Sequence, residues 1–163
     1  MEQKVLVFDP EKCIGCRLCE KFCSLGHEGV INPSKSRIRL QRDHLIQKDI
    51  AIYCHQCETT PCIEACQFDA LTRDSETNAI IVKEEECVAC GDCIQVCLYD
   101  VPILDSDTDI VIICDLCRGS PECVEICPEQ AINFMGLEEA KKLRNKINKR
   151  ISQKGFKEAN KNE

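Results

Sequence analysis

Sixteen cysteines dominate the chemistry that this 163-residue chain can offer. They fall into four groups of four, with none left over. Groups one and three have the spacing C-x2-C-x2-C-x3-C, whereas the middle gap holds four residues in group two and five in group four. The groups are Cys13, Cys16, Cys19 and Cys23; Cys54, Cys57, Cys62 and Cys66; Cys87, Cys90, Cys93 and Cys97; and Cys114, Cys117, Cys123 and Cys127.

This spacing is typical of cubane iron–sulfur clusters. Three closely spaced thiolates can wrap a loop around one cluster, and the fourth ligates the neighbouring cluster in two-cluster ferredoxins. Structural zinc sites instead take two pairs of ligands. Disulfides would bridge poorly across such short loops, and a redox thiol relay would not need the third and fourth cysteine of each group. The sequence therefore predicts four [4Fe-4S] clusters.

The rest of the composition agrees with a core built on bound clusters. Hydrophobic residues make up 44% of the chain, but the cysteines are counted among them, and there are only five Phe, two Tyr and no Trp. A core so poor in large side chains would not offset the entropy of ordering the chain. We expect the clusters to supply the missing interior.

The elements around groups two and three match a complete two-cluster ferredoxin. We predict an opening strand at 50–53 and a closing strand at 101–104. Between the two groups, strands at 70–72 and 79–82 should form a hairpin around the polar turn 74–78.

Groups one and four then form the halves of a second ferredoxin. Strands at 5–8 and 131–134 would open and close it, and its central hairpin would pair 37–40 with 109–113. Sequential pairing of the groups is the alternative, but it would turn the 30-residue gap between groups one and two into a very long hairpin. We therefore favour the nested arrangement.

The expected fold class is α+β, with one bacterial-type 2[4Fe-4S] ferredoxin module inserted into another and a C-terminal helix. The outer module would comprise 1–44 and 106–136, the inserted module 45–105, and the tail 137–163.

The exchange of the fourth cysteine between paired groups predicts the ligands of each cluster. Each set takes the first three cysteines of one group and the last cysteine of its partner group. The predicted sets are Cys13, Cys16, Cys19 and Cys127; Cys54, Cys57, Cys62 and Cys97; Cys87, Cys90, Cys93 and Cys66; and Cys114, Cys117, Cys123 and Cys23.

The charge is unevenly distributed. The chain carries −7, but 137–163 holds nine basic residues and four glutamates, which leaves −12 on the remainder. A body this acidic argues against nucleic acid as a partner. In the tail, Leu137, Ala140, Leu143, Ile147 and Ile151 follow helical spacing, so we predict a basic amphipathic helix that frays beyond Ile151. We expect it to pack on its own acidic body, with a docking arm or membrane-surface binding as alternatives.

Two patterns bear on location. No run of 18 apolar residues exists, so no transmembrane helix is expected. The first nine residues lack the charged and apolar regions of a secretory signal. We therefore expect a cytoplasmic protein, in which disulfides are disfavoured.

Four residues near the cysteines allow more than one interpretation. His55 could tune its cluster through a proton-linked charge, but we expect it to be a solvent-exposed loop residue. His27 is most simply a loop residue. Tyr53 and Tyr99 are expected to pack beside clusters rather than to relay electrons.

Residues inside the cysteine loops also suggest roles. Gly15, Gly91 and Gly119 could let backbone N–H groups approach sulfur, or could serve only as tight turns. Arg17 and Arg118 could offset cluster charge or contact a partner, with plain solvated residues as the equal alternative.

The pattern from Val5 to Phe134 resembles the four-cluster electron-transfer subunits of the dimethyl sulfoxide reductase type, in which nested pairing is the rule. The compact length, Cys23-Ser24-Leu25 and the stretch 32–38 are similar to the small subunits of tungsten aldehyde oxidoreductases, formate hydrogenlyase and carbon monoxide dehydrogenase. The resemblance implies a catalytic tungsten or molybdenum partner subunit, a tungsten aldehyde oxidoreductase first among them. It also implies a redox partner such as a flavin subunit or a ferredoxin.

Four thiolates per cluster leave no iron open to substrate, so the chemistry is one-electron transfer and the chain itself is not expected to be catalytic. Two hypotheses follow. The chain is an electron-transfer subunit of an oxidoreductase complex, or it is a free polyferredoxin that serves several enzymes.

Overall fold

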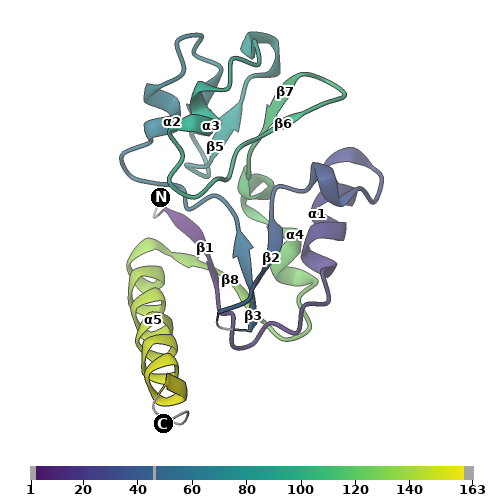
Figure 1. Cartoon of the computed structure of the whole chain (residues 1–163). Coiled ribbons are helices and arrows are strands. Elements are labelled where there is room, and N and C mark those ends of the chain that lie inside the picture. Colours follow the sequence, from purple (N-terminus) through teal and green to yellow (C-terminus); the bar gives the residue numbers. More distant parts are fainter. Residues whose placement is uncertain (1–2, 46, 160–163) are drawn as a thin grey trace.

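The computed structural model describes residues 3–45 and 47–159 as a mixed helix and strand fold, which confirms the α+β prediction (Figure 1). Its strands form four two-stranded antiparallel sheets. The strands are β1 (Lys4–Phe8), β2 (Arg39–Asp43), β3 (Lys48–Ile52), β4 (Leu71–Arg73), β5 (Ile80–Val82), β6 (Ile103–Asp105), β7 (Ile110–Ile112) and β8 (Ile132–Gly136). The helices are α1 (Leu18–Glu28), α2 (Pro61–Glu64), α3 (Asp92–Gln95), α4 (Glu122–Glu125) and α5 (Leu137–Ala159), with 3₁₀ turns η1 (Pro33–Lys35), η2 (Glu84–Glu86) and η3 (Leu116–Gly119).

Strands β1 and β8 lie where the opening and closing strands were predicted, and they pair with each other, which joins the two ends of the cysteine-bearing region. Their register places Leu6 opposite Phe134. Successive side chains of a strand point to opposite faces, so β1 has two environments. Leu6 is buried in the core that contains the cysteines, whereas Val5 and Val7 are buried against α5. The uninterrupted apolar run in β1 follows from this cover on both faces.

The predicted hairpin between groups two and three is also present. Thr72 in β4 pairs with Ile81 in β5. The polar turn between the strands is held by Asp74, whose carboxylate accepts from the Thr77 N–H at 2.7 Å, and Asn78 adopts a left-handed backbone. Asp and Asn are suited to such turns because their side chains bond the nearby backbone and they tolerate positive φ.

One predicted pairing is wrong. The segment 37–40 does not pair with 109–113, whereas the predicted strands at 50–53 and 101–104 are present as β3 and β6. Instead β2 forms a local hairpin with β3, and β6 forms one with β7. Local hairpins close short loops, which costs less chain entropy than joining strands about 70 residues apart.

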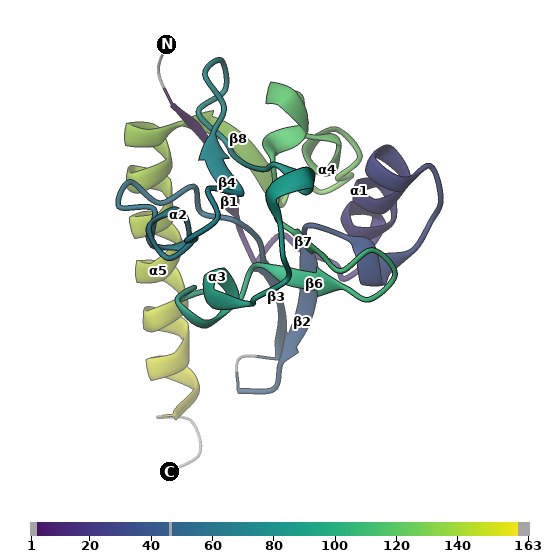
Figure 2. The same cartoon turned by 90° about the horizontal axis from the view of Figure 1, so that it is seen from above.

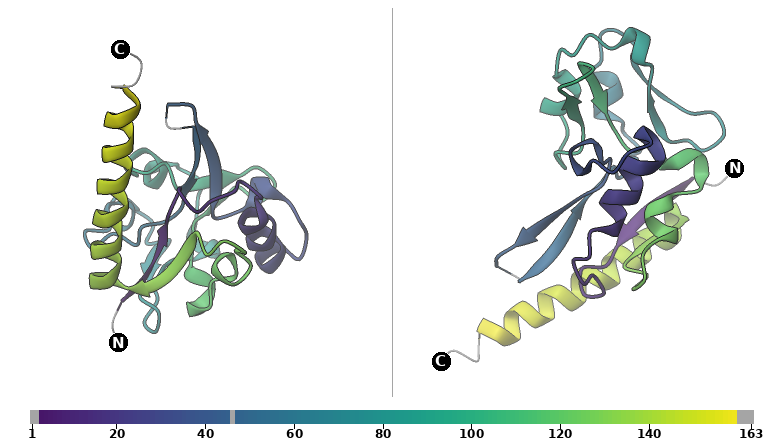
Figure 3. Two further views of the ribbon diagram at one scale, coloured as in Figure 1. Left: turned by 90° about the horizontal axis from the view of Figure 1, so that it is seen from below. Right: turned by 90° about the vertical axis from the view of Figure 1, so that its right-hand side faces the viewer.

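The two local hairpins straddle the predicted module boundaries at 44/45 and 105/106. The turn of the second is built on Asp105, which accepts from the Asp107 N–H at 3.1 Å, while Asp109 adopts a positive φ. The β2–β3 hairpin projects from the body in the same direction as the far end of α5 (Figure 3). The two predicted modules are therefore joined by continuous hairpins rather than by flexible linkers.

Helix α5 packs on the body, as expected, along one side of the molecule (Figure 2). Ala140 and Ile147 are buried against β1. Arg150 pairs with the Asp9 carboxylate at 2.6 Å and with Glu11 at 3.4 Å, so the basic tail meets acidic groups of the body. The helix does not end near Ile151 but continues to Ala159, through a run of residues most of which favour helix. No helix in the described residues has the length and apolar character needed to cross a membrane.

Candidate iron–sulfur cluster sites

Each cysteine group combines a loop with the start of a helix. The third cysteine of every group is the second residue of its helix, so each helix start presents one cysteine in the same position. Left-handed residues reverse the chain just before three of these helices, at Arg17, Thr60 and Gly91. The third cysteines and their helices are Cys19 in α1, Cys62 in α2, Cys93 in α3 and Cys123 in α4.

The fourth cysteines diverge from their own loops. Cys23 lies within the long helix α1, whereas Cys66, Cys97 and Cys127 follow the last residues of α2, α3 and α4. The extra turns of α1 therefore set group one apart from the other three groups.

Three cavities are each lined by four thiols drawn from two groups. In each, three cysteines come from one group and the fourth comes from the end of another. One is lined by Cys13, Cys16, Cys19 and Cys127, a second by Cys54, Cys57, Cys62 and Cys97, and a third by Cys66, Cys87, Cys90 and Cys93.

The remaining four thiols gather deeper in the molecule. Burial, followed by the nearby Cys23 and Cys117 thiols, raises the pKa of Cys123 well above its usual value. The pKa of Cys114 is raised in the same way by burial and by Cys123 and Cys54. The thiols of Cys23, Cys114, Cys117 and Cys123 thus lie close enough to affect one another's charge.

Several of the buried thiols would be neutral without a bound cation, because burial raises their pKa. Burial raises the pKa of Cys19 and Cys54 to about 12, and that of Cys93 and Cys117 to about 11. All sixteen cysteines are free of disulfides. A metal centre displaces the protons of such thiols and supplies the positive charge that their thiolates need. This donor set, four thiols to a site with no second ligand type among the predicted ligands, fits a [4Fe-4S] cluster.

Backbone N–H groups point at the sulfur atoms from several loops. Gly15 donates to Cys13 Sγ at 3.4 Å, and its φ of +70° is a conformation that glycine adopts without strain. Such bonds lower the electron density on sulfur and are a main control on cluster potential. Further N–H···Sγ bonds run from Arg37 to Cys23, Gln56 to Cys54, Val101 to Cys97 and Ala131 to Cys127, at 3.2–3.5 Å.

Comparison with known families agrees with this geometry. Residues 48–137 match the model of a 4Fe-4S dicluster domain, and residues 6–24 match that of a 4Fe-4S binding domain. The "Aliphatic sulfonate oxidoreductase, polyferredoxin-like subunit" of Pyrococcus furiosus is 46% identical over 124 residues, which cover 76% of this chain and 71% of that protein. The chain belongs to the ferredoxin-like 4Fe-4S electron-transfer family. Its sixteen cysteines hold four [4Fe-4S] clusters.

Other relatives extend over most of the chain. The "Putative electron transport protein YsaA" of Escherichia coli is 35% identical and covers 86% of this chain and 95% of its own. Among solved structures, a chain of the "Active site complex BamBC of Benzoyl Coenzyme A reductase in complex with Benzoyl-CoA" matches with a TM-score of 0.50 and 26% identity, over 83% of this chain and 80% of that one. The likeness thus extends beyond the cysteine loops.

In this ferredoxin-like chain, the environment of His55 differs from the prediction. It is not a solvent-exposed loop residue but lies between two tyrosines, with ring centroids 4.9 Å from Tyr53 and 4.0 Å from Tyr99 and interplanar angles of 10°. Burial, reinforced by the Arg144 cation, lowers the pKa of His55 to about 4. It is therefore neutral at physiological pH. Tyr53 and Tyr99 do pack beside the cysteines of groups two and three, as expected.

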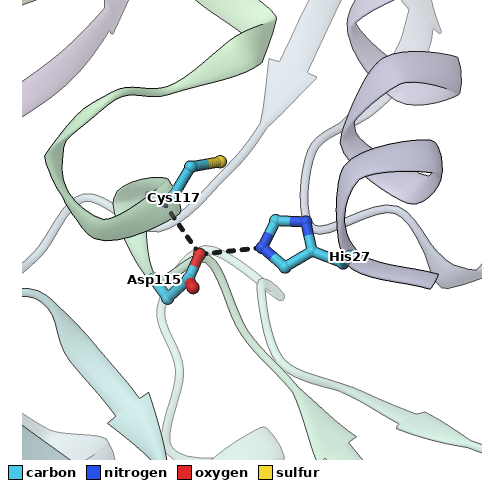
Figure 4. Close-up of side chains that lie close together, drawn as sticks. All are labelled: His27, Asp115 and Cys117. Atoms are coloured by element: carbon cyan, nitrogen blue, oxygen red, sulfur yellow. Dashed lines mark hydrogen bonds and ion pairs between the residues drawn. The ribbon is translucent and has the colours of Figure 1, made fainter. Parts of the chain in front are cut away.

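His27 is not a loop residue either, because it lies in the last turn of α1 and reaches group four (Figure 4). Its Nε2 is 3.0 Å from the Asp115 carboxylate and its Nδ1 is 2.8 Å from the Cys23 carbonyl. Hydrogen bonding to Asp115 is the main reason that its pKa rises to about 10. Burial acts to raise the pKa of Cys23, but hydrogen bonding with His27 and the Arg37 N–H lowers it overall. His27 thus favours the thiolate form of a cluster ligand.

The two arginines inside the loops have different settings. Arg17 pairs with Glu20 at 3.2 Å, and the buried Glu20 carboxylate also accepts from the Leu40 N–H at 2.7 Å. Arg118 is exposed at the edge of a polar cavity that also contains His27. Arg17 therefore braces α1, and Arg118 faces solvent near group four.

One buried side chain near the clusters carries no signal in the sequence. Gln56 is only 1% exposed and lies between Cys54 and Cys57. Its amide donates to the Cys114 carbonyl and accepts from the Ile80 N–H, both at 2.8 Å. It thereby joins the loop of group two to the start of group four. An uncharged polar residue in a loop is ordinary in sequence, so only the structure identifies it.

Proposed function

We propose that the chain is a non-catalytic electron-transfer subunit of an oxidoreductase complex. The observation that carries the proposal is the set of three cavities, each lined by four thiols from two groups. When bound, a [4Fe-4S] cluster with four thiolates exchanges single electrons and offers no open iron to a substrate. The residues described here hold and insulate such clusters.

The proposed ligand sets follow this arrangement. Each cavity supports one set, and the mutual pKa effects of the deeper thiols support the fourth. The sets are Cys13, Cys16, Cys19 and Cys127; Cys54, Cys57, Cys62 and Cys97; Cys66, Cys87, Cys90 and Cys93; and Cys23, Cys114, Cys117 and Cys123.

Electrostatic contacts between thiols of different sets support an order for the relay. Cys19 influences Cys123, Cys54 influences Cys114, and Cys62 influences Cys93. The proposed order of the sets along the relay is therefore the Cys13 set, the Cys114 set, the Cys54 set and the Cys87 set. The first and last of these are the end sets, and the other two are the inner sets.

The end sets offer surface for partners. Each has an exposed second cysteine, Cys16 or Cys90. The residue after the first cysteine is also exposed in both, with 65% of Ile14 and 54% of Val88 accessible. Exposed aliphatic residues beside a redox centre are suited to close contact with another protein. We propose that electrons enter at one end set and leave at the other.

For the catalytic partner we propose a tungsten or molybdenum oxidoreductase, a tungsten aldehyde oxidoreductase first. The sequence resemblance supports this choice. The second redox partner would be a flavin subunit or a ferredoxin. Relatives named as subunits, including the "Thiosulfate reductase electron transfer subunit PhsB" of Salmonella typhi at 26% identity, favour a complex over a free polyferredoxin.

Anaerobic purification of the full chain from its source cells tests the proposal. Iron and sulfide analysis should give about sixteen of each per chain, and fewer than about twelve irons would overturn four clusters. Native mass spectrometry should show the chain bound to a larger metal-containing subunit. A chain that always runs alone at native abundance would instead establish the free polyferredoxin.

A further inference from the structure

The side chain of Arg144 on α5 differs from the basic residues that pair with carboxylates and resembles Arg39 and Arg73, which donate to backbone carbonyls. Lys35, Arg37, Lys141 and Arg150 each contact a carboxylate. Arg144 is half-buried, and in the described part of the chain no carboxylate pairs with it. Its Nη2 donates to the Leu6 carbonyl at 2.8 Å, while its Nε is buried without a partner.

A guanidinium in this position needs a negative charge nearby. Removing an arginine from water without a partner is costly, because the low-dielectric interior solvates the charge poorly. The Leu6 carbonyl offers only a dipole. Four thiolates around a 2+ iron–sulfur core leave a net charge of about −2, which is the missing counter-charge if a cluster lies close by.

Arg144 is connected through a row of aromatic side chains to the cavity of one inner set, the Cys54 set. Its charge acts on the hydroxyl of Tyr53, which accepts from the Phe8 N–H at 3.2 Å, two residues along β1 from the carbonyl that Arg144 bonds. Tyr53 stacks on His55, and His55 stacks on Tyr99. His55 and Tyr99 line the same cavity as Cys54, Cys57, Cys62 and Cys97.

We propose that Arg144 is a positioning residue of the relay, a fixed cation that raises the reduction potential of the cluster held by the Cys54 set. The inference rests on the proposed ligand sets. A positive charge beside a cluster stabilises the form that has gained one electron. The aromatic stack begins at the buried Tyr53 and ends at Tyr99 in the wall of the cavity. In this way α5 acts on electron transfer from outside both ferredoxin-like modules.

The charge of Arg144 would affect electron transfer through the inner Cys54 set. A cluster with buried ligands is harder to reduce than one at the surface, because the added charge is poorly solvated, and Cys54 and Cys62 are both buried. Arg144 compensates for this and keeps the Cys54 set from becoming an uphill step between its neighbours. The end sets exchange electrons with partners without its help.

The test is a redox titration of the reconstituted full chain, followed by electron paramagnetic resonance. In Arg144→Gln, one of the four midpoint potentials should become more negative while those of the end sets stay in place. Arg144→Lys should restore most of the shift. Lys141→Gln removes the same charge from an exposed site on the same helix, where solvent screens it, and should change nothing. A Cys57→Ser variant identifies the signal of the Cys54 set.

An unchanged set of potentials in fully loaded Arg144→Gln would overturn the proposal, as would an equal shift of all four. If Arg144→Gln loses iron, Tyr53→Phe provides the second test, because it removes only the hydroxyl on which the charge of Arg144 acts. It should give a smaller negative shift of the same signal, and no shift would overturn the proposal. Failure of the proposed electron-transfer function would have a different result from failure of the Arg144 proposal. The unmodified chain would then lack iron, whatever the potentials of the Arg144 variants.

Discussion

The end loops and the inner loops of this chain share their ligand type but differ in their surroundings. Groups one and three have the shorter spacing, and their second cysteines, Cys16 and Cys90, are exposed. Groups two and four have longer middle gaps, and their first cysteines, Cys54 and Cys114, are buried. The inner loops also carry the side-chain contacts of Gln56 and of His27 with Asp115. The difference suggests that the end loops exchange electrons with partners while the inner loops insulate the path between them.

The largest expected effect comes from removing one cysteine ligand from an inner loop and one from an end loop. Cys114→Ser should lose about eight irons per chain, because its cluster and that of the neighbouring inner set share one core. Cys16→Ser should lose at most about four irons and keep the fold. Iron analysis and far-ultraviolet circular dichroism of anaerobic samples provide the measurement. Equal losses in the two variants would contradict a distinction between inner and end loops.

Gln56→Leu probes the inner loops without touching a ligand. It leaves the Cys114 carbonyl and the Ile80 N–H buried without partners, at a cost of about 3 kcal/mol. The thermal midpoint of the loaded protein should fall by about 6–12 °C. Gln95→Leu, at an exposed position on α3, is the matched control and should stay within about 2 °C. A similar fall in both would show that Gln56 does not brace the core.

His27→Gln should have a smaller effect on the same measurement. It removes the charge-assisted hydrogen bond to Asp115 and a contact that favours the Cys23 thiolate. The expected destabilisation is about 1–2 kcal/mol, or about 3–6 °C. His44→Gln, in the exposed turn after β2, controls for the loss of an imidazole and should leave the midpoint unchanged. If the two variants behave alike, His27 is only a surface group.

The smallest effect is expected at the end loops. Ile14→Ser and Val88→Ser should leave the thermal midpoint within about 2 °C because both side chains are exposed. Each should slow electron exchange with a reduced 2[4Fe-4S] ferredoxin or with the partner subunit by about threefold to tenfold, at most about 1.4 kcal/mol. Leu45→Ser, at a site that is 94% exposed and far from any cysteine in sequence, is the control. Unchanged rates in both end variants would remove these loops as contact sites.

The sequence predicted features that depend on local spacing. The quartets, the β4–β5 hairpin, the strands β1 and β8 and the start of the tail helix all carry strong local patterns. The pairing of 37–40 with 109–113 was wrong because short apolar strands do not specify their partners, and the polar turn 105–109 was the signal that favoured a local hairpin. The ligand sets and the module boundaries remain predictions.

The contacts that refine the site could not be predicted because they join distant residues. His27 meets Asp115 across 88 positions, Gln56 meets the Cys114 carbonyl across 58, and Arg144 meets the Leu6 carbonyl across 138. No periodicity in one sequence encodes such pairs. The same residue types occur elsewhere in the chain without these roles, as His44 and Gln95 show.

The pairing of β1 with β8 has a consequence for how the protein is made. Strand β1 must wait for a partner that ends at Gly136, so the ribbon cannot form until residues up to Gly136 have left the ribosome. The stretch that contains groups two and three is complete about 30 residues earlier. We therefore expect iron and sulfide to enter the middle of the chain first, and the terminal segments to close around an already assembled centre.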